Sequence, residues 1–326
     1  MVIEMAQHFL LSPAAKTLSL AKVLRMTDKQ AENSFAAIRW HETDGAPVCP
    51  ECGGTEHYNL KSRPVWKCKA CAKQFSMTSG TIFHSRKLGL RDILGAIAIF
   101  TNGAKGYSAL QLSRDLGCDY KTCFVMLHKL REAIKLARDE GALQGDVELD
   151  GAYFGGYVKP ENKAADRKDR RKAANRSGKR QSVIVAREKN GRTLATVAQR
   201  EADGVAFARR FIASGSTVHA DEASHWDQLT ANFPIKRINH QIAYRGTDGA
   251  CTNQAESFFS RVRRAEIGIH HHIAGDYLQA YVTEMAWRED ARRQSNGNQF
   301  AMLVSAAAAA PKSGQWCGYW QRHVAS

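Results

Sequence analysis

Two pairs of cysteines constrain the fold of this 326-residue chain more than any other feature. Cys49 and Cys52 form one Cys-x-x-Cys pair, and Cys68 and Cys71 form a second pair after fifteen intervening residues. Four thiolates at this spacing, each pair on a tight turn, can close a tetrahedral zinc site that replaces a core too small to fold alone. The pattern therefore predicts a zinc ribbon over residues 46–82 that holds one structural Zn²⁺, which should perform no chemistry itself.

The charge balance indicates a polyanionic partner. Lys and Arg number 47 against 32 Asp and Glu, a formal net charge of +15, and such a surface attracts nucleic acid through counterion release. The basic residues around the ribbon form either a solvated face or a phosphate-contacting face, and the overall charge favours phosphate: they are Lys61, Arg63, Lys67, Lys69 and Lys73.

No segment suggests a membrane. The longest strongly apolar run, residues 93–100, is too short to span a bilayer, and the first residues lack the features of a secretory signal. We therefore expect a cytoplasmic, nucleoid-associated protein with no membrane partner.

Helical periodicity precedes and follows the ribbon. Residues 1–45 form a helical segment that either packs on the neighbouring ribbon or helps to hold DNA or a second subunit. Residues 88–138 are again helical, and a short helix, a turn at Gly117 and a second helix capped by Asp119 indicate a helix-turn-helix. Its interior is expected from Leu110, Leu116, Phe124, Leu127 and Leu130, and its groove-facing residues from Tyr120, Lys121, Thr122 and Lys129.

The second half of the chain has a different pattern. A strand at 147–154 is followed by a hairpin of strands at 182–186 and 193–198, because Lys189-Asn190-Gly191 is a strong turn signal. A helix that starts at Asp203, a strand at 216–220, a helical segment at 225–233, a strand at 235–240 and a long helix from Thr252 come next. This order is that of an RNase H-like (retroviral-integrase-like) α/β domain, here over residues 145–295. The whole chain is thus expected to be a multidomain α+β protein, with residues 296–326 as a C-terminal tail.

Three acidic residues fall where such a fold brings side chains together. Asp150 lies on the first strand, Asp221 ends the fourth, and Glu256 is one turn into the long helix. Each alone would more often be a turn or capping residue. Together, three hard oxygen ligands favour Mg²⁺ (or Mn²⁺) over Zn²⁺, and two such ions could promote phosphoryl transfer.

The residues around these acids resemble a known family. The segments Glu148-Leu-Asp150-Gly-Ala-Tyr-Phe-Gly-Gly156, His219-Ala-Asp221-Glu222 and Thr252-Asn-Gln-Ala-Glu256-Ser-Phe-Phe-Ser260 are similar to those of the ISXO-type insertion-sequence transposases, relatives of the Merlin elements. The similarity includes the ribbon and a later His270-His271-His272 run. It implies a transposase that binds terminal inverted repeats and target DNA, cuts and joins strands, and assembles as a homodimer or higher oligomer on DNA.

The resemblance also implies site residues. Asp150, Asp221 and Glu256 correspond to the family's catalytic acids, whereas Arg263 stands where the family usually has a DNA-facing lysine. Asn253 also matches the family and could orient Glu256 or replace it as the third ligand. Adjacent histidines do not share one helical face, so His270, His271 and His272 are expected to contact DNA or to pack.

Other functions stay open. The run from Lys159 to Arg180, with ten basic and three acidic residues, is either a solvated loop or a loop that clamps DNA. The chain could also be a domesticated DNA-binding regulator that retains the fold, but such a regulator has no need for three acids around a metal. A metal-dependent nuclease without a joining step is a third possibility.

Overall fold

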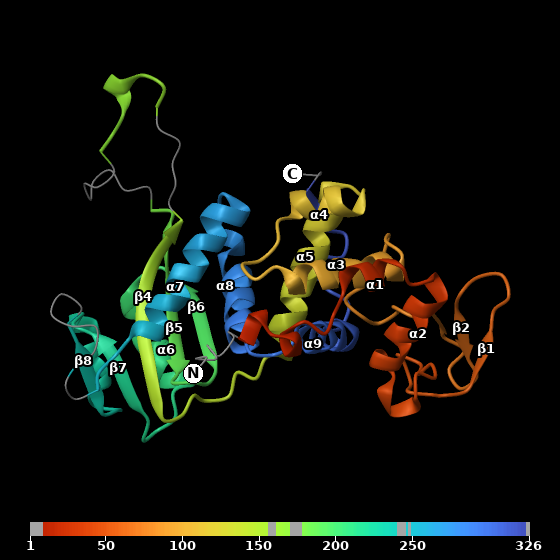
Figure 1. The fold of residues 1–326 in the computed structure, drawn as a ribbon, viewed down its shortest axis with the longest axis horizontal. Coiled ribbons are helices and arrows are strands. Elements are labelled where there is room, and N and C mark those ends of the chain that lie inside the picture. Colours follow the sequence, from red (N-terminus) through yellow and green to blue (C-terminus); the bar gives the residue numbers. More distant parts are fainter. Residues whose placement is uncertain (1–8, 156–160, 170–177, 240–245, 247–248, 324–326) are drawn as a thin grey trace, which may run out of the picture. The chain divides into compact units, whose positions relative to one another are not determined.

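The computed structural model describes residues 9–155, 161–169, 178–239, 246 and 249–323 (Figure 1). The chain divides into two compact units: residues 1–138 together with 291–326, and residues 139–290. The second unit thus begins and ends a few residues earlier than the domain expected over 145–295. The expected tail, residues 296–326, belongs to the first unit.

The first unit is helical around a small sheet. Its elements are α1 (Leu20–Leu24), α2 (Asp28–Arg39), β1 (His57–Asn59), β2 (Trp66–Cys68), β3 (Gln74–Phe75), α3 (Leu90–Asn102), α4 (Ala109–Leu116), α5 (Tyr120–Ala137), α9 (Asn296–Ala309) and α10 (Tyr319–His323). Helix α2 begins with a capping box, in which Thr27 and Gln30 each bond the other's backbone. Ten of the thirteen residues of α3 are buried, so this apolar helix forms the centre of the unit.

The C-terminal segment completes the core of the first unit. Helix α9 packs against α2, α3 and α5, and it buries Leu303, Val304, Ala307 and Ala308. At its start, the Oδ1 atom of Asn296 accepts hydrogen bonds from the backbone N–H groups of Thr17 and Leu18, at 2.8 Å each. The alanine-rich sequence of α9 shows no clear amphipathic pattern, so its place in the core is evident only from these contacts.

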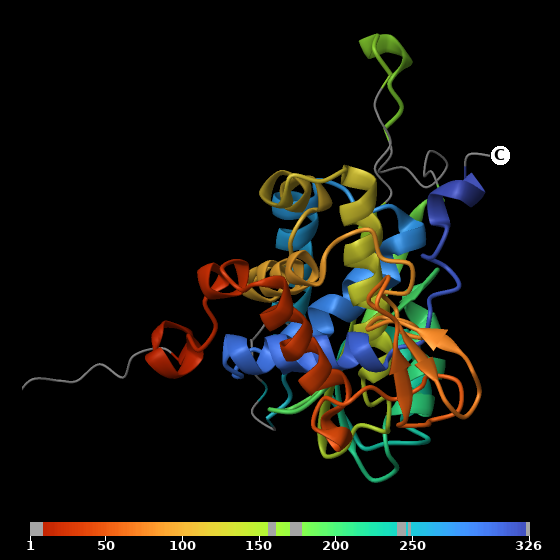
Figure 2. The same ribbon diagram turned by 90° about the vertical axis from the view of Figure 1, so that its right-hand side faces the viewer.

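The ribbon is an antiparallel sheet of order β1-β2-β3, drawn in orange in Figure 2. Trp66 and Phe75 pack against Ala36 and Trp40 at the end of α2. The helical segment before the ribbon therefore packs on it, which is one of the two roles expected for residues 1–45.

The second unit is built on a five-stranded sheet. Its strands are β4 (Asp146–Gly155), β5 (Arg180–Glu188), β6 (Thr193–Ala198), β7 (Thr217–Asp221) and β8 (Ile235–Ile238), in the spatial order β6-β5-β4-β7-β8. The first three pair antiparallel, and β7 and β8 run parallel to β4. At the β5–β6 turn, Asn190 has a positive φ of 63°, in agreement with the hairpin signal.

Helices cover both faces of this sheet. On one face, α6 (Gly204–Phe211) and the 3₁₀ segment η7 (Ser224–Leu229) pack over Val147, Leu149 and Val218. On the other face, α7 (Asn253–Ala265) and α8 (Gly275–Asp290) pack over β4, β5 and β6 (Figure 1). Because strand side chains alternate between faces, the even-numbered residues of β4 and the odd-numbered residues of β7 point toward α7.

Candidate active site and zinc site

The four cysteines of the ribbon converge as the spacing predicts. The Sγ atoms of Cys49 and Cys71 lie 3.6 Å apart, as do those of Cys52 and Cys68, and all four lie within 4.8 Å of one another. Four sulfurs bound tetrahedrally at about 2.3 Å from Zn²⁺ would be separated by about 3.8 Å. The geometry therefore fits one structural Zn²⁺.

Each cysteine pair lies on its own turn, and the two turns have the same geometry. The N–H of Gly53 donates to the carbonyl of Cys49, and the N–H of Ala72 donates to the carbonyl of Cys68. Gly53 and Ala72 both have positive φ, at 72° and 60°, so the two turns match although only one carries glycine. Repeated turn geometry places both pairs of thiols toward one point.

Two aspartates meet where two strands of the second unit separate. The pairing of β4 with β7 ends at Glu148 and His219, and two residues later each strand carries an aspartate, Asp150 or Asp221. The backbone N–H of Gly151 donates to Asp150, and that of Ala223 donates to Asp221. Both aspartate side chains are partly buried at this end of the sheet.

A third carboxylate, which the sequence pattern did not predict, joins them. Glu201 belongs to the 3₁₀ segment η6 (Glu201–Asp203), and its ligand oxygen lies within 4.8 Å of those of Asp150 and Asp221. Its side chain passes over Gly151, where a Cβ atom would lie 2.3 Å from the Glu201 Cγ. In sequence, Glu201 resembles an ordinary helix-start acid, so only the approach over Gly151 reveals its position.

Burial and neighbouring negative charges raise the pKa values of two carboxyl groups in this cluster. Burial, and then the charges of Asp221, Glu201 and Glu256, raise the pKa of Asp150 to about 7. Burial, with the charge of Asp221, also raises the pKa of Glu201 to about 7. Clustered carboxylates of this kind are stabilised in their charged form by a bound cation, and their oxygens suit a hard ion such as Mg²⁺.

The remaining expected residues lie on α7. Asn253 and Glu256 are exposed on its first turn, and the negative charge of Glu256 is among the causes that raise the pKa of Asp150. Glu256 is not a member of the set within 4.8 Å. Two turns further on, the guanidinium of Arg263 lies over the ring of Phe154 on β4, at 5.4 Å.

Residues of the expected helix-turn-helix divide into exposed and buried groups. Gly117 ends α4 with a positive φ of 61°, which fits the expected turn, and Tyr120 and Lys121 are exposed. Three expectations are wrong. Lys129 is only 8% exposed, so it does not face a DNA groove. Leu110 is 51% exposed, while Leu112 is the buried residue of α4. Asp119 precedes α5 without a side-chain capping bond.

Other basic and histidine segments are only partly described. Of the run from Lys159 to Arg180, residues 159–160 and 170–177 lie outside the described residues, and the described remainder is exposed throughout. His270 ends the π-helical segment η8 (Glu266–His270) and packs edge-on against Tyr281, whereas His271 and His272 are exposed. The three histidines thus do not form one site.

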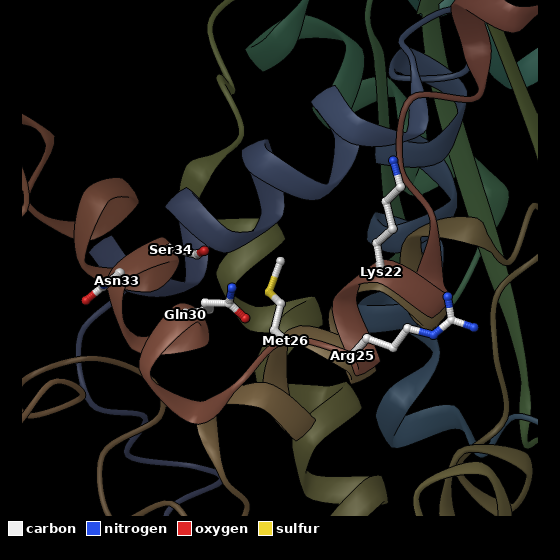
Figure 3. Close-up of a pocket in the computed structure, with 6 residues that line it drawn as sticks. All are labelled: Lys22, Arg25, Met26, Gln30, Asn33 and Ser34. Atoms are coloured by element: carbon white, nitrogen blue, oxygen red, sulfur yellow. The ribbon is translucent and has the colours of Figure 1, made fainter.

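A surface depression in the first unit shares no residue with either candidate site. It lies beside α1 and α2 and is lined by Lys22, Arg25, Met26, Gln30, Asn33 and Ser34 (Figure 3). These lining residues include no cysteine, histidine or carboxylate, so they offer no set of metal ligands.

Comparison with known proteins identifies two domains. Residues 142–290 match the ISXO2-like transposase domain, and residues 26–74 match the transposase zinc-ribbon domain. Together these matches cover more than half of the chain. A similar protein of Halobacterium salinarum, described as an uncharacterized protein in transposable element ISH50, is 28% identical over 131 residues. That alignment covers 39% of this chain and 42% of the relative, so it spans less than half of either protein.

No solved structure matches the chain. Among the described residues, no helix is long and apolar enough to cross a membrane.

Proposed function

The chain belongs to the ISXO2-like transposases, and we propose that it binds the terminal repeats of an insertion sequence and catalyses metal-dependent DNA strand cleavage and strand transfer. The observation that carries this proposal is the convergence of Asp150 and Asp221. Each lies two residues beyond the point where β4 and β7 stop pairing with each other. Glu256 is the proposed third acid.

The sheet supports an RNase H-like assignment for the second unit. Along the chain, three antiparallel strands are followed by two strands that run parallel to β4, with helical segments between them, which is the chain order expected for that fold. Its first and fourth strands are adjacent, which brings Asp150 and Asp221 to the same end of the sheet. The convergence of these acids supports the function independently of any analogy between folds.

The chain's own residues would hold and orient the reacting groups. Asp150 and Asp221, with Glu256 as the third acid, would hold two Mg²⁺ or Mn²⁺ ions, which when bound activate the attacking oxygen and stabilise the leaving oxygen of a phosphodiester. Arg263, on the same face of α7 as Glu256, would contact a DNA phosphate. Glu201 would add negative charge beside Asp150.

DNA recognition would come from the first unit. The zinc ribbon and the α4–α5 pair carry exposed basic and aromatic residues such as Lys67 and Tyr120, which suit phosphate and groove contacts. Two ends must be processed together, so we propose that a homodimer or higher oligomer acts on the paired ends and target DNA.

A strand-cleavage assay tests the proposal. The full-length protein is incubated with labelled DNA from the flanks of its gene and with a target plasmid, in Mg²⁺ or Mn²⁺. We expect cut ends and joined products from the unchanged protein, binding without chemistry from Asp150→Asn and Asp221→Asn, and normal products from Glu222→Gln. Glu222 is the matched control because it is an exposed acid next to Asp221. Cutting without joining would indicate a nuclease, and binding without any cutting would indicate a regulator.

A further inference from the structure

Three residues lie side by side on the central strands of the five-stranded sheet. Two of them, Glu148 and His219, come two residues before Asp150 and Asp221 on their strands. Glu148 on β4 is the antiparallel partner of Arg187 on β5 and the parallel partner of His219 on β7. By strand alternation all three point to the face covered by α7. All are buried, with 5%, 7% and 4% of their surface exposed, which is unusual for ionisable side chains.

Two members of this row contact the backbone at the start of α7. The Oε2 atom of Glu148 accepts hydrogen bonds from the N–H groups of Gln254, at 2.7 Å, and Ala255, at 3.0 Å. The Nη1 atom of Arg187 donates to the carbonyl of Gln254 at 3.3 Å. The backbone of Gln254 is therefore held at both its N–H and its carbonyl by two neighbouring strands.

His219 holds the segment that leads into the helix. Its Nδ1 atom accepts a hydrogen bond from the N–H of Cys251 at 3.3 Å, and its Nε2 atom lies 3.1 Å from the Oδ1 atom of Asp146. With the Nδ1 atom as acceptor, the Nε2 atom carries the proton, and this N–H group donates a hydrogen bond to the Oδ1 atom of Asp146. The imidazole is thus fixed at both nitrogens between β4 and the start of α7.

These bonds take the place of an ordinary helix cap. The first N–H groups of a helix have no partner within the helix, and Thr252 provides no side-chain cap to α7. The carboxylate of Glu148 supplies the missing acceptor, with a negative charge at the positive end of the helix dipole. A cap supplied from a strand, rather than from the helix itself, ties the helix to one position along that strand.

The position of α7 relative to β4 and β7 matters because each of these three elements carries a candidate acid directly after its anchored residues. On β4 the next residue on the same face is Asp150, and on β7 it is Asp221; on α7, Glu256 comes directly after Ala255. We propose that Arg187, Glu148 and His219 form a positioning row that fixes residues 251–255, and with them Glu256, beside the Asp150 and Asp221 carboxylates. The role of Glu256 in this inference rests on the proposed function. Glu148 and its neighbours act through α7 and do not hold metal or DNA.

The alternative for Glu148 is that it is a further metal ligand, and matched substitutions separate the two roles. Glu148→Gln keeps an oxygen at the same reach but removes the charge, whereas Glu148→Asp keeps the charge but withdraws it by one C–C bond, about 1.5 Å. Positioning requires a side-chain oxygen that reaches the N–H groups of Gln254 and Ala255. Glu148→Gln should therefore still cleave DNA, whereas Glu148→Asp should cleave it far more slowly. Asp150→Asn is the reference for loss of a ligand on the same strand face.

Two measurements on the full-length protein test the row. The first is hydrogen–deuterium exchange of a peptide that covers Gln254 and Ala255, without DNA. The second is single-turnover cleavage together with the Kd for end DNA. For Glu148→Asp we expect faster exchange at these amides, a Kd within about twofold, and cleavage slower by about a hundredfold, the cost of misplacing a group by about 1 Å. For Glu148→Gln we expect exchange near that of the unchanged protein and cleavage within about tenfold of it.

The outcomes are distinguishable. Unchanged exchange in Glu148→Asp, or a Glu148→Gln protein as inactive as Asp150→Asn, overturns the positioning row. If the unchanged protein does not cleave DNA, the proposed function fails, while exchange still decides whether Glu148 anchors α7. If Glu148→Asp does not fold, the comparison of Glu148→Gln with Asp150→Asn still decides between positioning and metal ligation.

Discussion

The Cγ atom of Glu201 lies 2.3 Å from the position that a Cβ atom on Gly151 would occupy. Gly151 comes directly after Asp150 on β4 and faces the opposite side of the sheet. The missing side chain lets Glu201 reach the two aspartates from the face covered by α6. The three carboxylates of this set therefore come from both faces of the sheet.

A methyl group at this position should expel Glu201. We expect Gly151→Ala to lower the free energy of unfolding by about 1–3 kcal/mol, the usual cost of overpacking, and to weaken Mg²⁺ binding. Urea unfolding and a metal titration would measure the two effects. The control is the double variant Gly151→Ala, Glu201→Ala, which removes the clash and should recover stability. If the double variant is no more stable than Gly151→Ala, the clash with Glu201 is not the cause.

The raised pKa values predict a pH dependence of the metal-free protein. Asp150 and Glu201 have ordinary pKa values of 3.8 and 4.5, and both are raised to about 7 in the fold. Between these limits the folded state binds more protons than the unfolded chain, so stability is greatest at the acid end and falls as the pH rises toward 7. Thermal melts in EDTA should show this fall. In Asp150→Asn it should be shallower, and an equal slope in both proteins would contradict the assignment.

The third acid can be decided by two substitutions on one helical turn. If Glu256 is the ligand, Glu256→Gln should reduce cleavage by orders of magnitude, whereas Asn253→Ala should retain most of it. DNA binding should persist in both proteins, because each change removes little volume. An active Glu256→Gln protein beside an inactive Asn253→Ala protein would transfer the role to Asn253.

Loss of one ribbon thiol should release the metal. Elemental analysis should find about one equivalent of zinc in the unchanged protein and little in Cys68→Ser, because metal binding and folding of such a small sheet are coupled. Cys317→Ser, which changes a cysteine outside the cluster, should keep its zinc. A full complement of zinc after all four ribbon cysteines are replaced would exclude this site.

Salt should weaken DNA binding in a log-linear manner. If the described basic residues Lys163, Arg167 and Lys168 bind phosphates, replacing them by alanine should make the slope of log K against log salt shallower by about 0.9 for each phosphate that is no longer neutralised. Binding titrations at several salt concentrations measure the slope. An unchanged slope would mean that this run is only a solvated loop.

The sequence predicted the features that depend on residues close together in the chain, and it missed those that depend on contacts between distant residues. The ribbon could be predicted from four cysteines because ligand spacing alone sets its turns. The strands of the second unit could be predicted from alternation and from the turn at Asn190. By contrast, Glu201 was missed because its place depends on an approach across Gly151 that no local pattern records.

The error at Lys129 has a tertiary cause. Helix α5 buries more of its surface than a two-helix motif requires, because α9 and residues near Trp316 pack on it. The ring of Trp316 stacks on His128, with 4.3 Å between the ring centroids. With the C-terminal segment taken as a tail, the buried side of α5 could not be distinguished from a groove-facing side.

The return of residues 291–326 to the first unit has a consequence for how the protein is made. Helix α9 supplies part of the core around α3, and it is translated only after the whole second unit. The first unit therefore cannot complete its core on the ribosome before the second unit has been synthesised. A product that terminates inside residues 139–290 would lack α9, and would therefore leave part of the buried surface of α3 uncovered. Under the proposed function, such a fragment would not be a fully folded competitor of the full-length protein for DNA.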